Sequence, residues 1–197
     1  MAKIGFAFTA SYCTFDKILV QLVLLQEAGH EIFPIASQEV TKVDTRVGKA
    51  EDFCNKVEQI TGKKIIDTIK DVELFGPKHP LDLVVIAPAT GNFIAKFEQG
   101  ITDNAPLMIT KATLRNENPA VIAVSTNDGL SNNGKNILTL YNTKNVFLVP
   151  FGQDDPIKKP HSLVAHYDQL GPTIERALEG KQIQPVLKEY TMIKTPK

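Results

Sequence analysis

The chain has 197 residues, of which 43% are hydrophobic, and 22 lysine and arginine residues balance 22 aspartate and glutamate residues. This composition suits one compact domain and argues against wholesale disorder, while the zero net charge argues against nucleic acid as the main partner, because such binding depends on a basic face that neutralises phosphates. No run approaches the ~20 apolar residues that a membrane span requires, and the two cysteines form no disulfide framework, so we expect a cytoplasmic protein.

Five short apolar runs are predicted to be strands of one sheet. Each is rich in Val, Ile or Phe and nearly continuous instead of alternating, which is typical of parallel strands that helices cover on both faces. The runs are Lys3–Phe8, Glu31–Ala36, Leu83–Ala87, Ala120–Ser125 and Asn145–Val149.

Segments with helical spacing lie between these strands. Phe15–Ala28 and Ala50–Ile60 each place apolar residues on one face of a helix and are followed by a glycine. Lys135–Tyr141 is a shorter predicted helix, and Leu163–Leu178 is a longer one with a break or kink at Gly171-Pro172. Strands that alternate with helices imply right-handed crossovers, so we predict an α/β fold with a three-layer, doubly wound, mostly parallel sheet of Rossmann-like type.

The last part of the chain shows little periodicity. Residues 150–160 contain three prolines and are predicted to form an irregular loop, and residues 181–197 are predicted to form a C-terminal tail. We therefore predict a single domain over residues 1–180.

Hydroxyl and amide side chains follow several predicted strands, where ligands of doubly wound sheets bind. These loops offer no histidine, no cysteine pair and no cluster of carboxylates, so we expect no metal site of ordinary composition. They also lack the glycine motifs of standard dinucleotide and triphosphate sites. Such loops suit hydrogen bonding to a neutral polar ring system and a phosphate. The segments are Thr9–Thr14, Ser37, Pro88–Phe93 and Thr126–Gly129.

Simpler structural roles compete with this interpretation. Ser11 or Thr14 could cap the first helix instead of binding a phosphate. Asn127 could belong to an Asn-Asp-Gly turn, since turn chemistry alone explains many Asn, Asp and Gly residues.

Pro88-Ala89-Thr90-Gly91-Asn92-Phe93, Ile94-Ala95-Lys96 and Gly100-Ile101-Thr102-Asp103-Asn104 resemble the flavin-loop motif of the homo-oligomeric flavin-containing Cys decarboxylases. That motif reads P-A-S-A-N-T or P-A-T-A-N-T, then I-A-K and G-I-A-D-N. Thr9-Ala10-Ser11 lies where the family has its T-G-S phosphate loop, Ser37 where a Ser or Thr contacts flavin, and Val124–Asn127 where P-A-M-N forms a substrate loop.

This resemblance implies a flavoprotein of the same fold that binds FMN and assembles as a trimer or a multiple of trimers, with flavin between protomers. The implied cofactor-binding residues are Thr9, Ala10, Ser11, Ser37, Ala89, Thr90 and Asn92.

Four further segments are similar to the B subunits of dipicolinate synthases, and this resemblance covers almost the entire chain. It implies a sporulation protein of spore-forming bacteria that oxidises a dihydrodipicolinate-type precursor from the lysine and diaminopimelate pathway to dipicolinic acid. It also implies a separate partner, the A subunit of dipicolinate synthase, where we expect the NAD(P) site. The segments are Ile122–Leu130, Val149–Pro156, Lys158–Pro160 and Leu178–Pro185.

The sequence departs from the decarboxylase pattern at the catalytic histidine, whose place falls near Glu73 and Leu74. The nearest histidine is His79, which we interpret as a solvated loop residue, so no catalytic residue is assigned. A dicarboxylate substrate needs cationic or amide donors. Our candidates are Arg46, Asn127, Lys135 and Asn136, although Arg46 could equally be a solvated surface charge.

Three functions stay open on the sequence alone. The first is a flavin-type subunit of an oxidoreductase. The second is a flavin-dependent decarboxylase or other lyase of a small carboxylate, and the third is a non-catalytic scaffold for the A subunit.

Overall fold

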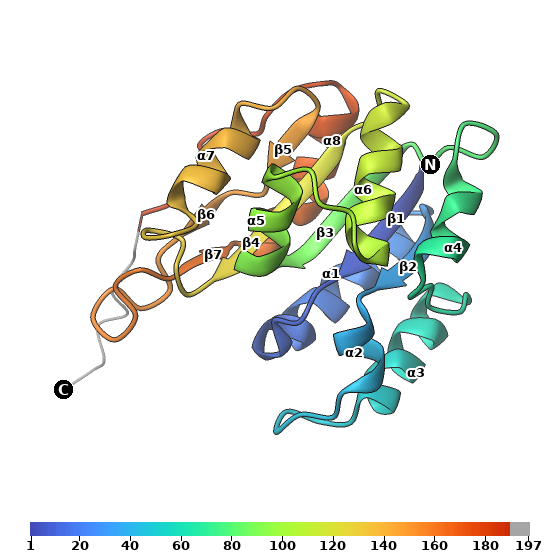
Figure 1. Ribbon diagram of the computed structural model, residues 1–197, viewed down its shortest axis with the longest axis horizontal. Helices are drawn as coiled ribbons and strands as arrows, with labels where there is room; N and C mark the ends of the chain where they lie inside the picture. Colours follow the sequence, from blue (N-terminus) through green and yellow to red (C-terminus); the bar gives the residue numbers. More distant parts are fainter. Residues whose placement is uncertain (190–197) are drawn as a thin grey trace.

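Five parallel strands form the centre of the molecule, in the order β2-β1-β3-β4-β5 (Figure 1). The computed structural model describes residues 1–189. Every residue of β3 and of β4 is buried, as their unbroken apolar runs require. The strands are β1 (Lys3–Phe8), β2 (Glu31–Ala36), β3 (Leu83–Ala89), β4 (Ala120–Thr126) and β5 (Val146–Leu148).

Two short antiparallel strands extend the sheet beyond β4. β5 pairs with the first half of β4, and β7 (Leu163–Ala165) pairs with its last residues. β6 (Phe151–Gly152) then pairs with β7 to complete a seven-stranded, mostly parallel sheet.

Helices cover both faces of the sheet and give the molecule three layers (Figure 1). On one face the core contains Ile18, Val57 and Ile174 from α1, α3 and α8, and on the other it contains Ile94, Leu107 and Ile137 from α5, α6 and α7. The helices are α1 (Phe15–Glu27), α2 (Gln38–Lys42), α3 (Ala50–Thr61), α4 (Ile69–Val72), α5 (Gly91–Glu98), α6 (Ala105–Arg115), α7 (Gly134–Tyr141) and α8 (Leu170–Leu178), with 3₁₀ turns at Tyr12–Thr14 (η1), Glu73–Phe75 (η2) and Tyr167–Gln169 (η3).

The predicted α/β fold with a doubly wound, mostly parallel sheet is confirmed, and β1 and β2 have the predicted bounds. One predicted helix is wrong. Leu163–Leu178 is not a single helix, because Leu163–Ala165 forms β7 and the helix begins only at Leu170. Pro172 therefore lies in the first turn of α8, where its missing N–H needs no partner within the helix.

Helix α6 was not predicted from the sequence. Asn104 caps it, since the Asn104 side-chain oxygen accepts a hydrogen bond from the Leu107 N–H at 3.0 Å, and Pro106 follows inside the first turn. An N-cap asparagine followed by proline is the signal that would have predicted this helix.

The segment after α8 hydrogen-bonds to the edge of the sheet. The Gln182 amide bonds both the N–H and the carbonyl of Leu148, at 2.8 and 2.7 Å. The Phe151 N–H donates to Val186, and the Lys188 N–H donates back to Phe151. The domain boundary at residue 180 stays a prediction, and residues 190–197 of the predicted tail lie outside the described residues.

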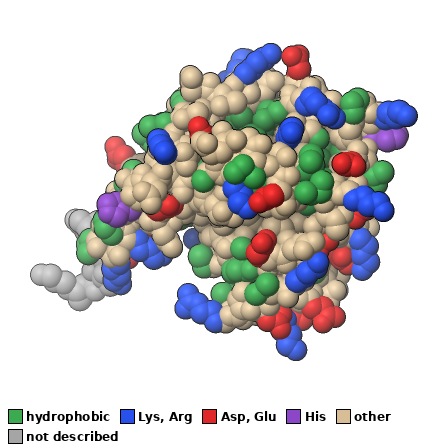
Figure 2. Space-filling model, viewed as in Figure 1, with side chains coloured by type: hydrophobic (Ala, Val, Ile, Leu, Met, Phe, Trp, Pro, Cys, Tyr) green, Lys and Arg blue, Asp and Glu red, His purple; other side chains and the backbone are tan. Residues whose placement is uncertain are grey.

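Charged side chains of both signs are interspersed over the face shown in Figure 2. Among the helices of residues 1–189, none has the length and apolar character needed to cross a lipid bilayer.

The buried face of α1 provides a test of the core. Leu22 is fully buried, whereas Leu24 on the same helix is 52% exposed. We expect Leu22→Ala to lower the free energy of unfolding by about 2–5 kcal/mol through lost burial and the cavity left behind, and Leu24→Ala to lower it by less than about 1 kcal/mol. Urea unfolding of both variants measures the difference, and equal losses would contradict the packing of α1 on the sheet.

Candidate functional site

The candidate site lies at the carboxyl ends of β1 and β3, which are neighbours at the centre of the sheet. From β1 the chain goes to β2 on one side, while from β3 it goes to β4 on the other. The order of the strands therefore reverses between β1 and β3, which is where doubly wound sheets bind ligands.

The Thr9 side chain ties these two strand ends together. Its buried hydroxyl donates to the Pro88 carbonyl at 2.7 Å and accepts from the Thr90 N–H at 3.0 Å. Because its only proton is used in this way, the Thr9 hydroxyl holds the loops after β1 and β3 in register and has no donor left for a ligand.

Thr90 and Ser37 extend the same edge. The Thr90 hydroxyl caps α5 by accepting from the Phe93 N–H at 3.3 Å, and Asn92 is exposed in the first turn of that helix. Ser37 is buried at the end of β2, and its N–H donates to the carbonyl of Phe8 at 3.1 Å. The hydroxyls that were predicted to contact a flavin therefore line one continuous edge across β2, β1 and β3.

A group of hydroxyls surrounds Ser11 in the loop after β1. Ser11 Oγ lies 2.8 Å from Ser125 Oγ at the end of β4, and the Thr14 hydroxyl donates to the Ser11 carbonyl at 2.8 Å. Tyr167 reaches this group from η3, and its hydroxyl is buried next to Thr14 and Ser125 without a hydrogen bond of normal geometry. Burial raises the pKa of Tyr167, and the neighbouring hydroxyls of Thr14 and Ser125 act against that rise.

The loop after β4 is held by a polar cluster around Asp128. Its carboxylate accepts hydrogen bonds from the Thr126 hydroxyl and, at 2.9 Å, from the Asn133 side chain, and Asn136 donates to Asn133 at 2.9 Å. This cluster presses against Gly91 at the start of α5, so that a Cβ there would lie 2.5 Å from Thr126 Oγ1. Asp128 lies in the segment Thr126–Gly129 that was predicted to face a ligand, but its role in holding this loop was not predicted.

The substrate candidates do not meet within one chain. Asn127 is exposed directly after β4, Lys135 is exposed in the first turn of α7, and Asn136 is buried and bonded to Asn133. Arg46 is exposed in the turn between α2 and α3, beyond β2. Since β1 and β3 separate β2 from β4, these two regions lie about 14 Å apart at the strand ends.

His79 is exposed in the turn that precedes β3, so the interpretation as a solvated loop residue is confirmed. A strand of seven residues spans about 20 Å, and the flavin-loop residues lie at its other end. No histidine stands at Glu73 or Leu74, where the decarboxylase pattern has its catalytic histidine.

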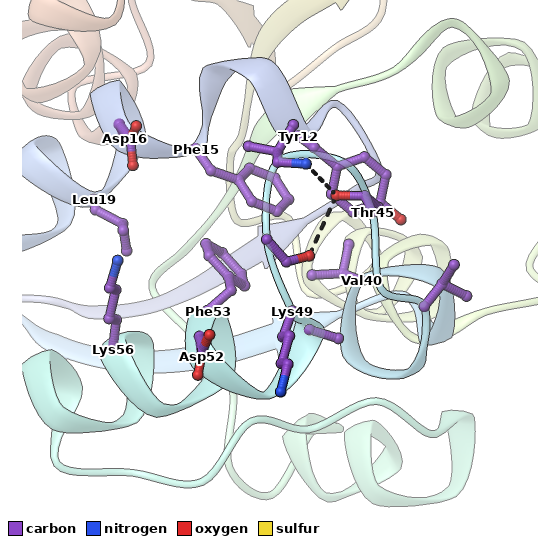
Figure 3. Close-up of a pocket in the computed structure, with 14 residues that line it drawn as sticks. Tyr12, Phe15, Asp16, Leu19, Val40, Thr45, Lys49, Asp52, Phe53 and Lys56 are labelled. Carbon is purple, nitrogen blue, oxygen red and sulfur yellow. Dashed lines mark hydrogen bonds between the residues drawn. The ribbon is translucent and has the colours of Figure 1, made fainter.

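A cavity of about 160 Å³ lies on the other side of the β1 loop, between α1, α2 and α3 (Figure 3). The rings of Phe15 and Phe53 stack in its wall with centroids 4.1 Å apart, and Tyr12 meets Phe15 edge to face. The Tyr12 hydroxyl donates to the Glu39 carbonyl at 2.8 Å and so joins the β1 loop to α2. This cavity is not lined by the predicted flavin-binding residues, so it is separate from the strand-end site.

The donors at the strand ends fit the phosphate end of a flavin mononucleotide. Ser11 precedes the short 3₁₀ turn η1, which leads into the 13-residue helix α1, and the start of a helix favours an anion. Hydroxyls and amides of this kind suit a phosphate and a polar ring system, which agrees with the predicted ligand chemistry.

Comparisons with known proteins find close relatives. Residues 1–169 match the family described as Flavoprotein. The chain is 46% identical over 187 residues to the B subunit of the dipicolinate synthase of Bacillus subtilis (strain 168), an alignment that covers 95% of this chain and 94% of the relative. A crystal structure of the dipicolinate synthase B subunit from Bacillus halodurans C superposes with a TM-score of 0.89 at 47% identity, over 96% of this chain and 97% of that one.

More distant structures share the fold. DmrB of Burkholderia xenovorans, solved in complex with FMN and described as a cubic protein cage for redox transfer, matches with a TM-score of 0.66 at 18% identity, over 90% of this chain and 96% of that one.

Gly91 provides a test of the contact between the two halves of the site. We expect Gly91→Ala to destabilise the protein by about 1–3 kcal/mol, because the added methyl group meets the polar cluster around Asp128. Gly171→Ala is the matched control, since Gly171 also lies in the first turn of a helix but has open space around it, and there we expect no loss or a gain of up to about 1 kcal/mol. Thermal unfolding compares the two, and a neutral Gly91→Ala would contradict the close contact.

Proposed function

The chain belongs to the flavoprotein family, and from this membership we propose that it is the FMN-binding B subunit of a dipicolinate synthase. The reaction is the oxidation of a dihydrodipicolinate-type precursor to dipicolinic acid during sporulation, in the bacterial cytoplasm. The A subunit of the enzyme is the partner and carries the NAD(P) site. The identity of 46% over 95% of the chain to the B subunit of a dipicolinate synthase supports this assignment.

The observation that carries the flavin role is the row of hydroxyls at the switch point of the sheet. Ser37, Ser11 and Thr90 follow three adjacent strands, and the Thr9 hydroxyl fixes two of their loops relative to each other. In the proposal, Ser11 and the start of α1 hold the phosphate of FMN. Ala89, Thr90 and Asn92 lie against the ring system.

The chemistry removes a hydride and a proton from a partly saturated ring that carries two carboxylates. A bound flavin supplies a hydride acceptor at this edge. The chain's own residues bind and orient the substrate. Asn127 and Lys135 are exposed donors in the segment that follows β4, and Asn136 holds the loop through Asn133.

A second copy of the chain completes the proposed site. Arg46 and Asn127 are separated by two strands within one chain, so the proposal places the Arg46 of a neighbouring copy at the substrate. A homo-oligomer, as a trimer or a multiple of trimers, is therefore part of the proposal. The FMN complex of DmrB, a protein cage with the same fold, is consistent with it.

Reconstitution with the A subunit tests the function. We expect the purified chain to bind FMN and to support dipicolinate formation only in the presence of the A subunit, the precursor and NAD(P). Full synthase turnover by the A subunit without this chain would replace the proposal with a scaffold role. Carbon dioxide release by the isolated chain would replace it with a lyase.

A matched pair of serine variants locates the flavin. Ser11→Ala removes a donor to a charged phosphate, so we expect FMN affinity to fall by about 10-fold or more. Ser131→Ala is the control, because Ser131 is exposed in the loop after β4 and its hydroxyl donates only to the Asp128 carbonyl. Fluorescence titration with FMN measures both affinities, and equal affinities would remove Ser11 from the site.

A further inference from the structure

Asp128 is a carboxylate that is held in place in the loop after β4. Its side chain accepts hydrogen bonds from the Thr126 hydroxyl and, at 2.9 Å, from the Asn133 amide. Its main-chain carbonyl accepts from the N–H groups of Ser131 at 3.0 Å and of Asn133 at 3.2 Å. The residue is half-buried, and the two side-chain bonds leave the carboxylate about two further acceptor positions. Asp128 therefore presents a negative charge that is fixed but not enclosed by the protein.

This charge lies where the two predicted ligand-binding loops meet. A Cβ on Gly91 would lie 2.9 Å from Asp128 Oδ1, so the carboxylate is in close contact with the start of α5, between Thr90 and Asn92. The exposed substrate candidate Asn127 directly precedes Asp128. In the proposed function the flavin ring lies against Thr90 and Asn92 and the substrate against Asn127, so Asp128 is a neighbour of both.

A negative charge at this position opposes the binding of the proposed ligands before they react. The precursor has two carboxylates and FMN has a phosphate, and like charges repel each other strongly in a partly buried site. Catalysis depends on how much better the transition state is bound than the substrate. A carboxylate here is therefore useful where positive charge appears during the reaction.

The proposed reaction produces such a charge on the ring of the substrate. A ring C–H bond breaks first, and its electron pair leaves as a hydride to the flavin acceptor. The ring that remains is one unit more positive, as in a protonated pyridine. A second ring hydrogen then leaves as a proton to water, and its electron pair stays behind to complete the aromatic ring of dipicolinate.

We propose that the carboxylate of Asp128 stabilises the positive charge that appears on the substrate ring as the hydride leaves. The inference rests on the proposed function for the reaction and for the place of the substrate. Because Thr126, Asn133 and the main chain already hold the carboxylate, it does not need to move when the ring charge develops, and charges arranged in advance in this way lower a barrier effectively. The substrate class that fits is a ring that passes through a pyridinium-like state.

A purely structural role is the alternative. An acidic side chain at the start of a helix stabilises that helix, and Asp128 also holds its own loop. The two roles differ in their effect on ligands of different charge. Loss of a structural residue weakens the binding of every ligand of the site, whereas loss of the charge weakens the binding of a cationic ring and relieves the repulsion of an anion.

Asp128→Asn tests the charge, because the variant keeps the size of the side chain and can keep both contacts. Its oxygen accepts from Asn133, and its amide donates to the Thr126 hydroxyl. Two probes are titrated calorimetrically in the presence of FMN: dipicolinate, and 1-methylpyridinium-2,6-dicarboxylate, whose ring is permanently positive. We expect Asp128→Asn to weaken binding of the pyridinium probe about 10-fold and to leave dipicolinate binding equal or tighter.

Two further variants separate charge from structure. Asp82→Asn is the matched control, because Asp82 accepts from the Lys3 N–H at 2.7 Å at the opposite end of β3, and we expect it to change the affinity for neither probe. Thr126→Val removes one hydrogen bond from the cluster but keeps the carboxylate, so the ratio of the two affinities should stay as in the wild type. Circular dichroism and thermal unfolding show whether each variant is folded.

The outcomes separate this inference from the proposed function. Equal losses of affinity for both probes in folded Asp128→Asn, or the same change of ratio in Thr126→Val, overturn the inference and leave the proposed function intact. Wild-type protein that binds no FMN, or binds FMN but neither probe, contradicts the proposed function and the inference with it.

Discussion

The hydroxyl of Thr9 joins the ends of β1 and β3, and the candidate site depends on that junction. The two strands are hydrogen-bonded along their length, but their pairing stops before the loops begin. Beyond that point the Thr9 hydroxyl connects the two chain segments through hydrogen bonds to the Pro88 carbonyl and the Thr90 N–H. The loop that carries Ser11 and the helix that begins after Thr90 therefore keep a fixed separation, as a site that holds both ends of one ligand requires.

A second polar contact fixes the other half of this edge. The cluster around Asp128 holds the loop after β4 and packs against Gly91, which has no side chain to keep the two apart. Asn127 is thereby held beside α5 while its own side chain stays exposed. Both contacts are made by side chains that face inwards, whereas Asn92 and Asn127 have exposed side chains.

The sequence predicted the sheet better than it predicted the site. The strands were visible because burial on both faces makes them continuous runs of Val, Ile and Phe, and β1 and β2 have the predicted bounds. The predicted helix Leu163–Leu178 was wrong because its first residues pair with β4. That pairing is a tertiary contact, which the hydrophobic periodicity of a sequence does not reveal. Among the candidate site residues, the loops that carry Ser11, Ser37 and Thr90 followed from the rule that ligands bind at strand ends, and the family resemblance gave these residues a flavin role. Tyr167 did not follow from that rule, since it reaches Ser125 from a turn much later in the chain, and a single sequence gives no sign of that contact.

A crystal structure of this protein grown with FMN tests the central claim most directly. The account predicts electron density for the phosphate within hydrogen-bonding distance of Ser11 and for the ring system against Thr90 and Asn92. Flavin bound instead in the cavity between Tyr12, Phe15 and Phe53 would contradict it, because that cavity lies on the other side of the β1 loop.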